Sequence, residues 1–206
     1  MIESILECVA RKARFLVVGG TNTGKTTLLS ALCNDGIYPG ARIVKIEDPE
    51  EIWLNHDQVV TLEARPAPPG SSVAPYGIKD GVDDAMRMSP DWLIVGEVRT
   101  GDAALTLFRA QMSDHPGLST FHAESPEYAI YRVGNLLISD TQETDMRNAR
   151  STFAMAVDMV IQLGWVNKER RILGVWEVEK MLKDGEVIIH PLYTLGDSEM
   201  KPMTVR

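Results

Sequence analysis

The stretch RFLVVGGTNTGKTT, from Arg14 to Thr27, contains the residues that decide the fold of this chain. It begins with a short continuous apolar run, which is typical of a buried strand, and passes through a glycine-rich turn into an apolar pattern that predicts a helix up to residue 33. A strand, a loop and a helix in this order are the repeating unit of parallel sheets. We therefore predict an α/β fold built outward from this strand.

The turn itself satisfies the pattern G-x-x-x-x-G-K-[ST], with Gly19, Gly24, Lys25 and Thr26 at its fixed positions. Glycines let such a loop curl so that backbone N–H groups point at a phosphate, and the following helix N-terminus adds positive dipole. A purely structural glycine turn would not need a lysine followed by a hydroxyl. The predicted nucleotide-binding residues are Gly19, Gly20, Thr21, Asn22, Thr23, Gly24, Lys25, Thr26 and Thr27.

The rest of the chain continues the alternation of strands and helices. Further strands are predicted at 42–47, 92–95 and 118–122, with a candidate at 58–64, and helices at 2–9, 77–88, 102–112 and 126–138. The proline-rich segment 63–75 is interpreted as a loop, because the alternation resumes directly after it. A helical stretch after Met146 leads into three β-rich runs parted by NKE and KDGE turns, which predict a closing antiparallel ribbon.

Composition limits the class of function. The chain has 206 residues, 44% of them hydrophobic, and 21 Lys plus Arg against 29 Asp plus Glu give a formal net charge of -8. That sign argues against nucleic acid as the main ligand. The apolar runs are shorter than the ~20 residues of a membrane-spanning helix, and no leader is recognisable at the start. We expect a cytoplasmic protein without a membrane span, in which Cys8 and Cys33 are reduced core residues.

Acidic residues follow two of the predicted strands. Glu47 and Asp48 end one strand, and Glu97 follows the strand 92–95, so all three would lie at the sheet edge from which the phosphate loop leaves. Hydrolysis needs one carboxylate to orient a water molecule and another for the metal, and the sequence leaves open which of Glu47 and Glu97 does which. The next two acids, Glu50 and Glu51, are interpreted as structural residues of a helical turn.

Among the histidines, only His122 ends a predicted strand on the same edge, where it could report the γ-phosphate to a neighbouring element. A histidine in such a place is more often simply a hydrogen-bonded polar residue. The other three, His56, His115 and His190, have no metal-ligand spacing with one another, and no Ser or Cys nucleophile has a matching base. Zinc chemistry and acyl transfer are therefore disfavoured.

Four stretches in order, GGTNTGKTT, IEDPEEI, RMSPDWLIVGEVR and HPGLSTFHA, resemble the Walker A, Asp box, Walker B and His box of the hexameric traffic ATPases of type II and type IV secretion. The resemblance covers residues from about 2 to 195, and Gly96 followed by Glu97 is its most specific element. The family has a RecA-like core that binds ATP and Mg²⁺. It also includes pilus-retraction and conjugal-transfer motors.

The resemblance implies roles for individual residues. Lys25 would bind the triphosphate, Thr26 and Glu97 the magnesium, and Glu97 with Glu47 would handle the attacking water, while His122 would couple the nucleotide state to a subunit interface. Arg87 and Arg99 match the arginines that flank the Walker B strand. Arg132 is a further candidate for reaching a neighbouring subunit.

The resemblance also implies a setting: a hexameric ring at the cytoplasmic face of the inner membrane, peripheral to it and in contact with other secretion or pilus proteins. The family's usual amino-terminal domain is not recognisable, so residues 1–206 are expected to form a single RecA-like domain. The leading hypothesis is an ATP-hydrolysing motor subunit for type IV secretion, conjugal transfer or pilus assembly and retraction. The alternatives are a nucleotide-binding interaction module with little turnover and a recombinase or helicase core, the last disfavoured by the net charge.

Overall fold

The strand that precedes the phosphate loop lies near the centre of an eight-stranded sheet. The computed structural model describes residues 1–70, 72–141 and 145–204. Its strands are β1 (Phe15–Gly19), β2 (Arg42–Glu47), β3 (Gln58–Glu63), β4 (Trp92–Val98), β5 (Gly117–His122), β6 (Met159–Val166), β7 (Glu169–Val178) and β8 (Ile189–Thr194). They are ordered β3-β2-β4-β5-β1-β6-β7-β8 across the sheet.

The sheet has a parallel part and an antiparallel part. The six strands from β3 to β6 pair in parallel, which confirms the predicted α/β class. Strands β7 and β8 are antiparallel, as predicted for the carboxyl-terminal ribbon. The first β-rich run of that ribbon, β6, pairs in parallel with β1 on one side and antiparallel with β7 on the other. The ribbon is therefore a direct continuation of the core sheet.

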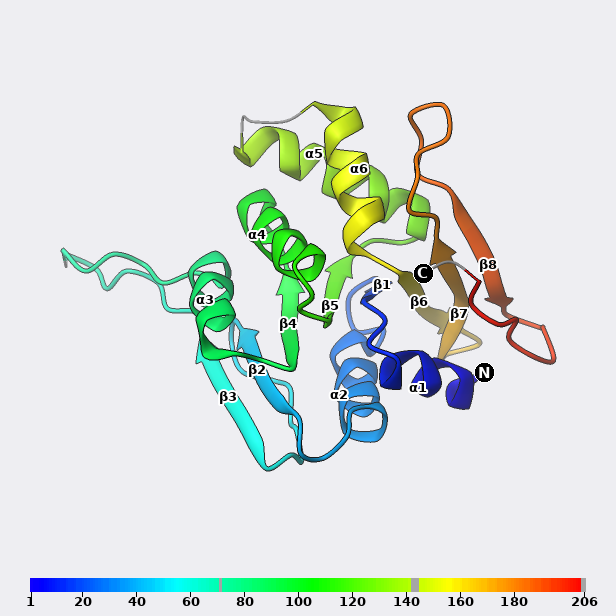
Figure 1. Cartoon of the computed structure of the whole chain (residues 1–206), viewed down its shortest axis with the longest axis horizontal. Coiled ribbons are helices and arrows are strands. Elements are labelled where there is room, and N and C mark those ends of the chain that lie inside the picture. The colour runs from blue at the N-terminus through cyan, green and yellow to red at the C-terminus, as the bar shows by residue number, and fades with distance from the viewer. Residues whose placement is uncertain (71, 142–144, 205–206) are drawn as a thin grey trace.

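Helices cover both faces of the sheet (Figure 1). They are α1 (Ile2–Ala10), α2 (Lys25–Gly36), α3 (Ile78–Ala85), the 3₁₀ turn η1 (Met86–Met88), α4 (Gly101–Met112), α5 (Pro126–Thr141) and α6 (Met146–Ala156). Helices α1 and α2 pack on one face, and α3 to α6 pack on the other. The result is a three-layer α/β/α arrangement.

Alternation along β1 explains how one short strand serves both layers. Leu16 and Val18 face the core under α3 to α6, whereas Phe15 and Val17 face the core under α1 and α2, and all four are buried. Such an uninterrupted apolar run is what a strand covered on both faces requires. Sheet and helices together hold the phosphate loop at the carboxyl end of β1, on a rigid base.

Some boundaries differ from the sequence prediction. Strand β4 continues past Val95 to Val98, because its last residues pair again with β5 after a shift of register. The residues after Pro49 form no helical turn; instead their backbone N–H groups at 51 and 52 bind a buried carboxylate. None of the helices in the described part of the chain combines the length and the apolar character that a bilayer span requires.

Candidate nucleotide-binding site

A cavity of about 450 Å³ opens at the carboxyl edge of the parallel strands. Its walls are residues 21–27 of the phosphate loop, the ends of β2, β4 and β5, and one residue of β7. Ligands of open α/β sheets bind at this edge. The predicted phosphate loop, both predicted acids and His122 therefore meet around one cavity.

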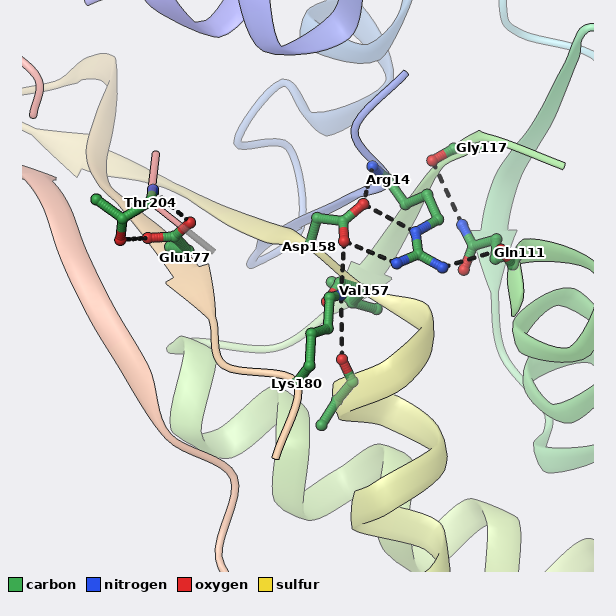
Figure 2. A network of polar contacts seen from close by, with 9 residues as sticks. Arg14, Gln111, Gly117, Val157, Asp158, Glu177, Lys180 and Thr204 are labelled. Carbon is green, nitrogen blue, oxygen red and sulfur yellow. Dashed lines mark hydrogen bonds and ion pairs between the residues drawn. The ribbon is translucent and has the colours of Figure 1, made fainter. Parts of the chain in front are cut away.

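A larger cavity, of about 970 Å³, lies at the opposite edge, where β1, β5 and β6 begin. Arg14 and Asp158 line it and belong to an ion network in which Arg14 donates to both oxygens of Asp158, and Lys180 lies 2.5 Å from the same carboxylate (Figure 2). Burial alone would raise the pKa of Asp158, but Arg14 and Lys180 outweigh it and hold that pKa below its ordinary value. None of the predicted site residues lines this cavity. The predicted nucleotide-binding residues therefore lie away from this cavity, although it is the larger of the two.

The phosphate loop has the backbone that its glycines allow. Gly24, at the N-cap of α2, has φ 93° in the left-handed region, which disfavours residues with a Cβ. A Cβ on Gly19 would lie 2.6 Å from the Thr23 Oγ1 atom and 2.8 Å from the Leu163 carbonyl oxygen, so only glycine fits between β1 and β6. The Thr23 hydroxyl donates to the Gly20 carbonyl oxygen at 2.9 Å and closes the turn. The glycines and this hydrogen bond thus set the conformation of the loop.

Lys25 lies at the first position of α2 and reaches back over the loop. Its Nζ atom donates to the carbonyl oxygens of Gly19 at 3.1 Å and Gly20 at 3.0 Å. Partial burial lowers the pKa of Lys25, and the nearby carboxylate of Glu97 opposes that shift. The ammonium therefore sits between the loop and the predicted catalytic acid, where a phosphate chain would meet both.

Glu47 is buried, with 1% of its surface exposed, and its carboxylate is fully engaged. Oε1 accepts from the backbone N–H groups of Glu51 at 3.0 Å and Ile52 at 2.8 Å, and Oε2 accepts from Lys45 Nζ at 3.0 Å. This pattern is that of a carboxylate that fastens the segment 48–52. The role of Glu47 toward water or metal stays a prediction.

Glu97 is more accessible than Glu47, with 28% of its side chain exposed. Its Oε2 accepts from Arg99 Nε at 2.8 Å, and the other carboxylate oxygen has no hydrogen bond within the described residues. The preceding residue, Gly96, faces Glu47: a Cβ there would lie 3.1 Å from the Glu47 Cγ atom. The Thr120 hydroxyl donates to the Gly96 carbonyl oxygen at 2.6 Å and fixes the end of β4. Two acids of different character thus lie side by side.

His122 pairs with Gly19 across the β1–β5 ladder, so it stands directly beside the start of the phosphate loop. Its carbonyl oxygen accepts from Arg132 Nη1 at 2.6 Å. The guanidinium of Arg132 lies over the rings of Phe121 and Tyr128, at 5.4 and 5.9 Å from their centroids. Arg132 is therefore occupied within its own subunit.

The remaining candidates are spread around the molecule. Arg99 belongs to the cavity, but it is bonded to Glu97 and lies 3.8 Å from Asp48. Arg87 does not line the cavity, and its side chain is 82% exposed. The other histidines lie outside it too, and the described residues contain no cluster of His, Cys, Asp or Glu that could hold a metal by itself.

Two residues that matter for the site carry no signal in the sequence motifs. Lys45 lies two residues before Glu47 on the same face of β2, where alternation would otherwise predict an apolar side chain. Hydrogen bonds from Lys45 to Glu50 and Glu47 raise its pKa in spite of its burial. The other is Arg170 on β7, which lines the cavity although it is 148 residues from the loop residue that it contacts.

The donor set fits a magnesium nucleotide. A tight glycine loop leads into the N-terminus of α2, Lys25 reaches back over that loop, and Thr26 and Glu97 line the same cavity. Hydroxyl and carboxylate oxygens suit Mg²⁺, which retains several waters and is completed by substrate phosphates. Because waters and phosphates would complete the coordination, the protein need not supply a full set of metal ligands.

The chain is similar to several known proteins. The chain is 34% identical over 182 residues to the protein MJ1287 of Methanocaldococcus jannaschii, covering 88% of this chain and 65% of that protein. It is 30% identical over 186 residues to a probable conjugal transfer protein TrbB of Sinorhizobium fredii, covering 86% and 51%. The crystal structure of the VirB11 ATPase from the Brucella suis type IV secretion system, solved with sulphate, superimposes with a TM-score of 0.74 at 25% identity, covering 85% and 51%.

The chain therefore spans between about half and two thirds of the length of these relatives. The family description "Type II/IV secretion system protein" matches residues 3–171, well over half of the chain. The observed RecA-like sheet, with its phosphate loop between β1 and α2, agrees with that match. On this evidence the chain belongs to the type II/IV secretion system protein family.

Proposed function

We propose that this chain is the ATP-hydrolysing domain of a motor subunit that drives type IV secretion, conjugal transfer or pilus assembly and retraction. The observation that carries the proposal is the convergence of the phosphate loop, Lys25 and a partly exposed Glu97 on one cavity. Family membership supports it, because relatives include a conjugal transfer protein and a secretion ATPase.

In the proposed reaction, the loop N–H groups and Lys25 bind the β- and γ-phosphates, which places the γ-phosphorus near the acids. Glu97 orients a water molecule in line with that phosphorus and accepts its proton, since Glu97 keeps an oxygen that no described residue occupies. Glu47 positions the segment next to this acid through its hydrogen bonds to residues 51 and 52.

Thr26 and Glu97 would hold the Mg²⁺ ion, directly or through its waters. When bound, the ion neutralises phosphate charge and orients the phosphate oxygens. His122 stands next to Gly19, so we assign it the coupling of the nucleotide state to a neighbouring element. The proposed setting is a homo-oligomeric ring, of hexameric type, at the cytoplasmic face of the inner membrane among other secretion or pilus proteins.

Phosphate release from Mg-ATP by the purified chain tests the proposal, with Lys25→Ala as the reference. Loss of the compact cation removes compensation for the β- and γ-phosphate charge, so Lys25→Ala should bind ATP far more weakly and release no phosphate. Lys25-dependent binding without phosphate release would favour the alternative function, a nucleotide-binding interaction module. Unchanged ATP affinity in Lys25→Ala would refute the site itself.

A further inference from the structure

A cation from the carboxyl-terminal ribbon lies over the phosphate loop. Arg170 on β7 donates from Nε to the carbonyl oxygen of Asn22 at 2.9 Å, and its stem is 3.4 Å from the position of a Cβ on Gly24. Across the β6–β7 ladder its direct partner is Trp165, which is 52% exposed. The guanidinium carbon lies 5.2 Å from the centroid of the Trp165 ring. The tryptophan and the loop together hold the guanidinium at the cavity wall.

The charges around the cavity indicate what Arg170 could bind. The lining contains four carboxylates, of Glu47, Asp48, Glu51 and Glu97, against the three cations Lys25, Arg99 and Arg170. Arg99 is bonded to Glu97 and lies near Asp48, so it is already compensated. Arg170 has no carboxylate partner within the described part of the chain. A phosphate chain with several negative charges therefore finds Arg170, besides Lys25, as the available positive group.

Sheet order places Arg170 relative to the phosphates. The acids leave β2 and β4, on one side of β1, whereas Arg170 leaves β7, on the other side. If the γ-phosphate lies toward the acids, the nucleoside end of the phosphate chain points toward β6 and β7. Arg170 faces that end.

We propose that Arg170 binds phosphate oxygens at the nucleoside end of a nucleoside di- or triphosphate, and that Trp165 is a positioning residue that holds its guanidinium. The inference rests on the proposed nucleotide site. An arginine suits this place because its Nε can hold the Asn22 carbonyl while both Nη groups stay free for phosphate. A lysine at 170 would keep the charge but could not make both contacts and stack on the ring.

The test is calorimetric titration of the whole chain with ADP and with ATP. Arg170→Ala should weaken both by about tenfold or more, the size expected when a charge-assisted hydrogen bond is lost. Arg170→Lys should recover only part of the affinity. The matched control is Arg171→Ala: that neighbour lies opposite Gly164, on the other face of β7, and pairs with Glu169, so its loss should leave the affinity unchanged.

Trp165→Ala distinguishes the positioning role. It should weaken ADP binding in the wild-type background but have little effect once Arg170 is alanine, because both changes remove the same contact. Equal affinities for Arg170→Ala and Arg171→Ala, with Lys25→Ala still unable to bind, would overturn this inference and leave the nucleotide site intact. A wild-type chain that binds no nucleotide would overturn both.

A purely structural role for Arg170 has its own signature. If the arginine only kept the loop folded, Arg170→Ala would lower the melting temperature of the protein without nucleotide. Pyrophosphate binding would weaken in the same variant. We expect the melting temperature without nucleotide to stay close to that of Arg171→Ala. A clear drop relative to that control would assign Arg170 to folding and would contradict the proposal.

Discussion

The Nζ atom of Lys45 lies 3.0 Å from Oε2 of Glu47, and the side chains of both residues are almost completely buried. Nζ also donates to the carbonyl oxygen of Ile52 at 2.6 Å and to Glu50 at 2.5 Å. A charged pair inside a sheet is costly unless each group is fully hydrogen-bonded, which is the case here. The pair ties β2 to the segment that borders the nucleotide cavity.

Glu47→Gln is therefore expected to destabilise the fold more than it affects nucleotide binding. Lys45 would lose the one anion that is buried with it, and breaking such a buried pair costs on the order of 3 kcal/mol. Urea unfolding measures the loss, and calorimetry measures the retained ATP affinity. Glu50→Gln is the control, because Glu50 meets the same lysine from an exposed position and its loss should change stability little. Normal stability combined with abolished turnover in Glu47→Gln would instead give Glu47 the role that we assign to Glu97.

Glu97→Gln should keep ATP affinity and lose turnover. The amide preserves size and hydrogen bonding but cannot accept a proton from water, so kcat is expected to fall by about 10²-fold or more. Steady-state phosphate release and ATP titration separate the two effects. Glu51→Gln is a suitable control, since Glu51 lines the same cavity but contributes its backbone N–H to the site architecture. Undiminished turnover in Glu97→Gln would transfer the water-orienting role to another group.

The ion network at the opposite edge predicts a pH dependence of stability. The pKa of Asp158 is lower in the folded protein than its unfolded value of about 3.9, so its contribution is present above that pH and is lost as the pH falls through the folded pKa. Asp158→Asn should reduce the free energy of unfolding at pH 7 and flatten its decline below about pH 4. Urea unfolding between pH 7 and pH 3 checks this, with the exposed Asp35→Asn as control. If the free energy of unfolding fell equally steeply at acid pH in the wild type and in Asp158→Asn, the prediction would be contradicted.

Local patterns predicted much of this molecule because they are set by neighbours in the chain. The phosphate loop is one contiguous motif, and its glycines are needed by its own backbone. The buried strand β1 is recognisable as a continuous apolar run, because both of its faces are covered. The edge strand β3 gave a weaker signal, since it is only half-buried.

Contacts between distant segments could not be read in the same way. Arg14 and Asp158 are 144 residues apart, and Arg170 and Asn22 are 148 apart, so nothing in either local sequence indicates a partner. Lys45 is a different case. It lies only two residues from Glu47, but a lysine is rarely buried unless it is paired, so the sequence alone would not place Lys45 in the core. The structure supplies those partners: Glu47, Glu50 and the Ile52 carbonyl oxygen. Which of Glu47 and Glu97 orients the attacking water stays a prediction.

Apart from Lys25, the described residues offer no uncommitted cation at the γ-phosphate end of the cavity, and this predicts that catalysis depends on association. Within the described residues, Arg99 is held by Glu97 and Arg132 is held by His122 and two rings, whereas Arg87 is exposed and reaches only within 3.9 Å of Asp84. Transition-state charge on a transferring phosphoryl group usually needs an additional cation, often from a neighbouring subunit. Arg87 is thus the candidate of this chain for acting on a neighbour.

Phosphate release per subunit should accordingly rise with protein concentration, in step with the mass measured by light scattering at each dilution. Arg87→Ala should lower the plateau without changing ATP affinity. Mixing Arg87→Ala with Lys25→Ala provides a sharper measurement. A Lys25→Ala chain keeps Arg87 and can supply it to the intact phosphate loop of an Arg87→Ala neighbour. Activity should therefore partly return in the mixture. A flat dilution profile at full activity would show that one chain is catalytically self-sufficient. A concentration-dependent profile without recovery in the mixture would instead mean that the cation comes from a residue other than Arg87.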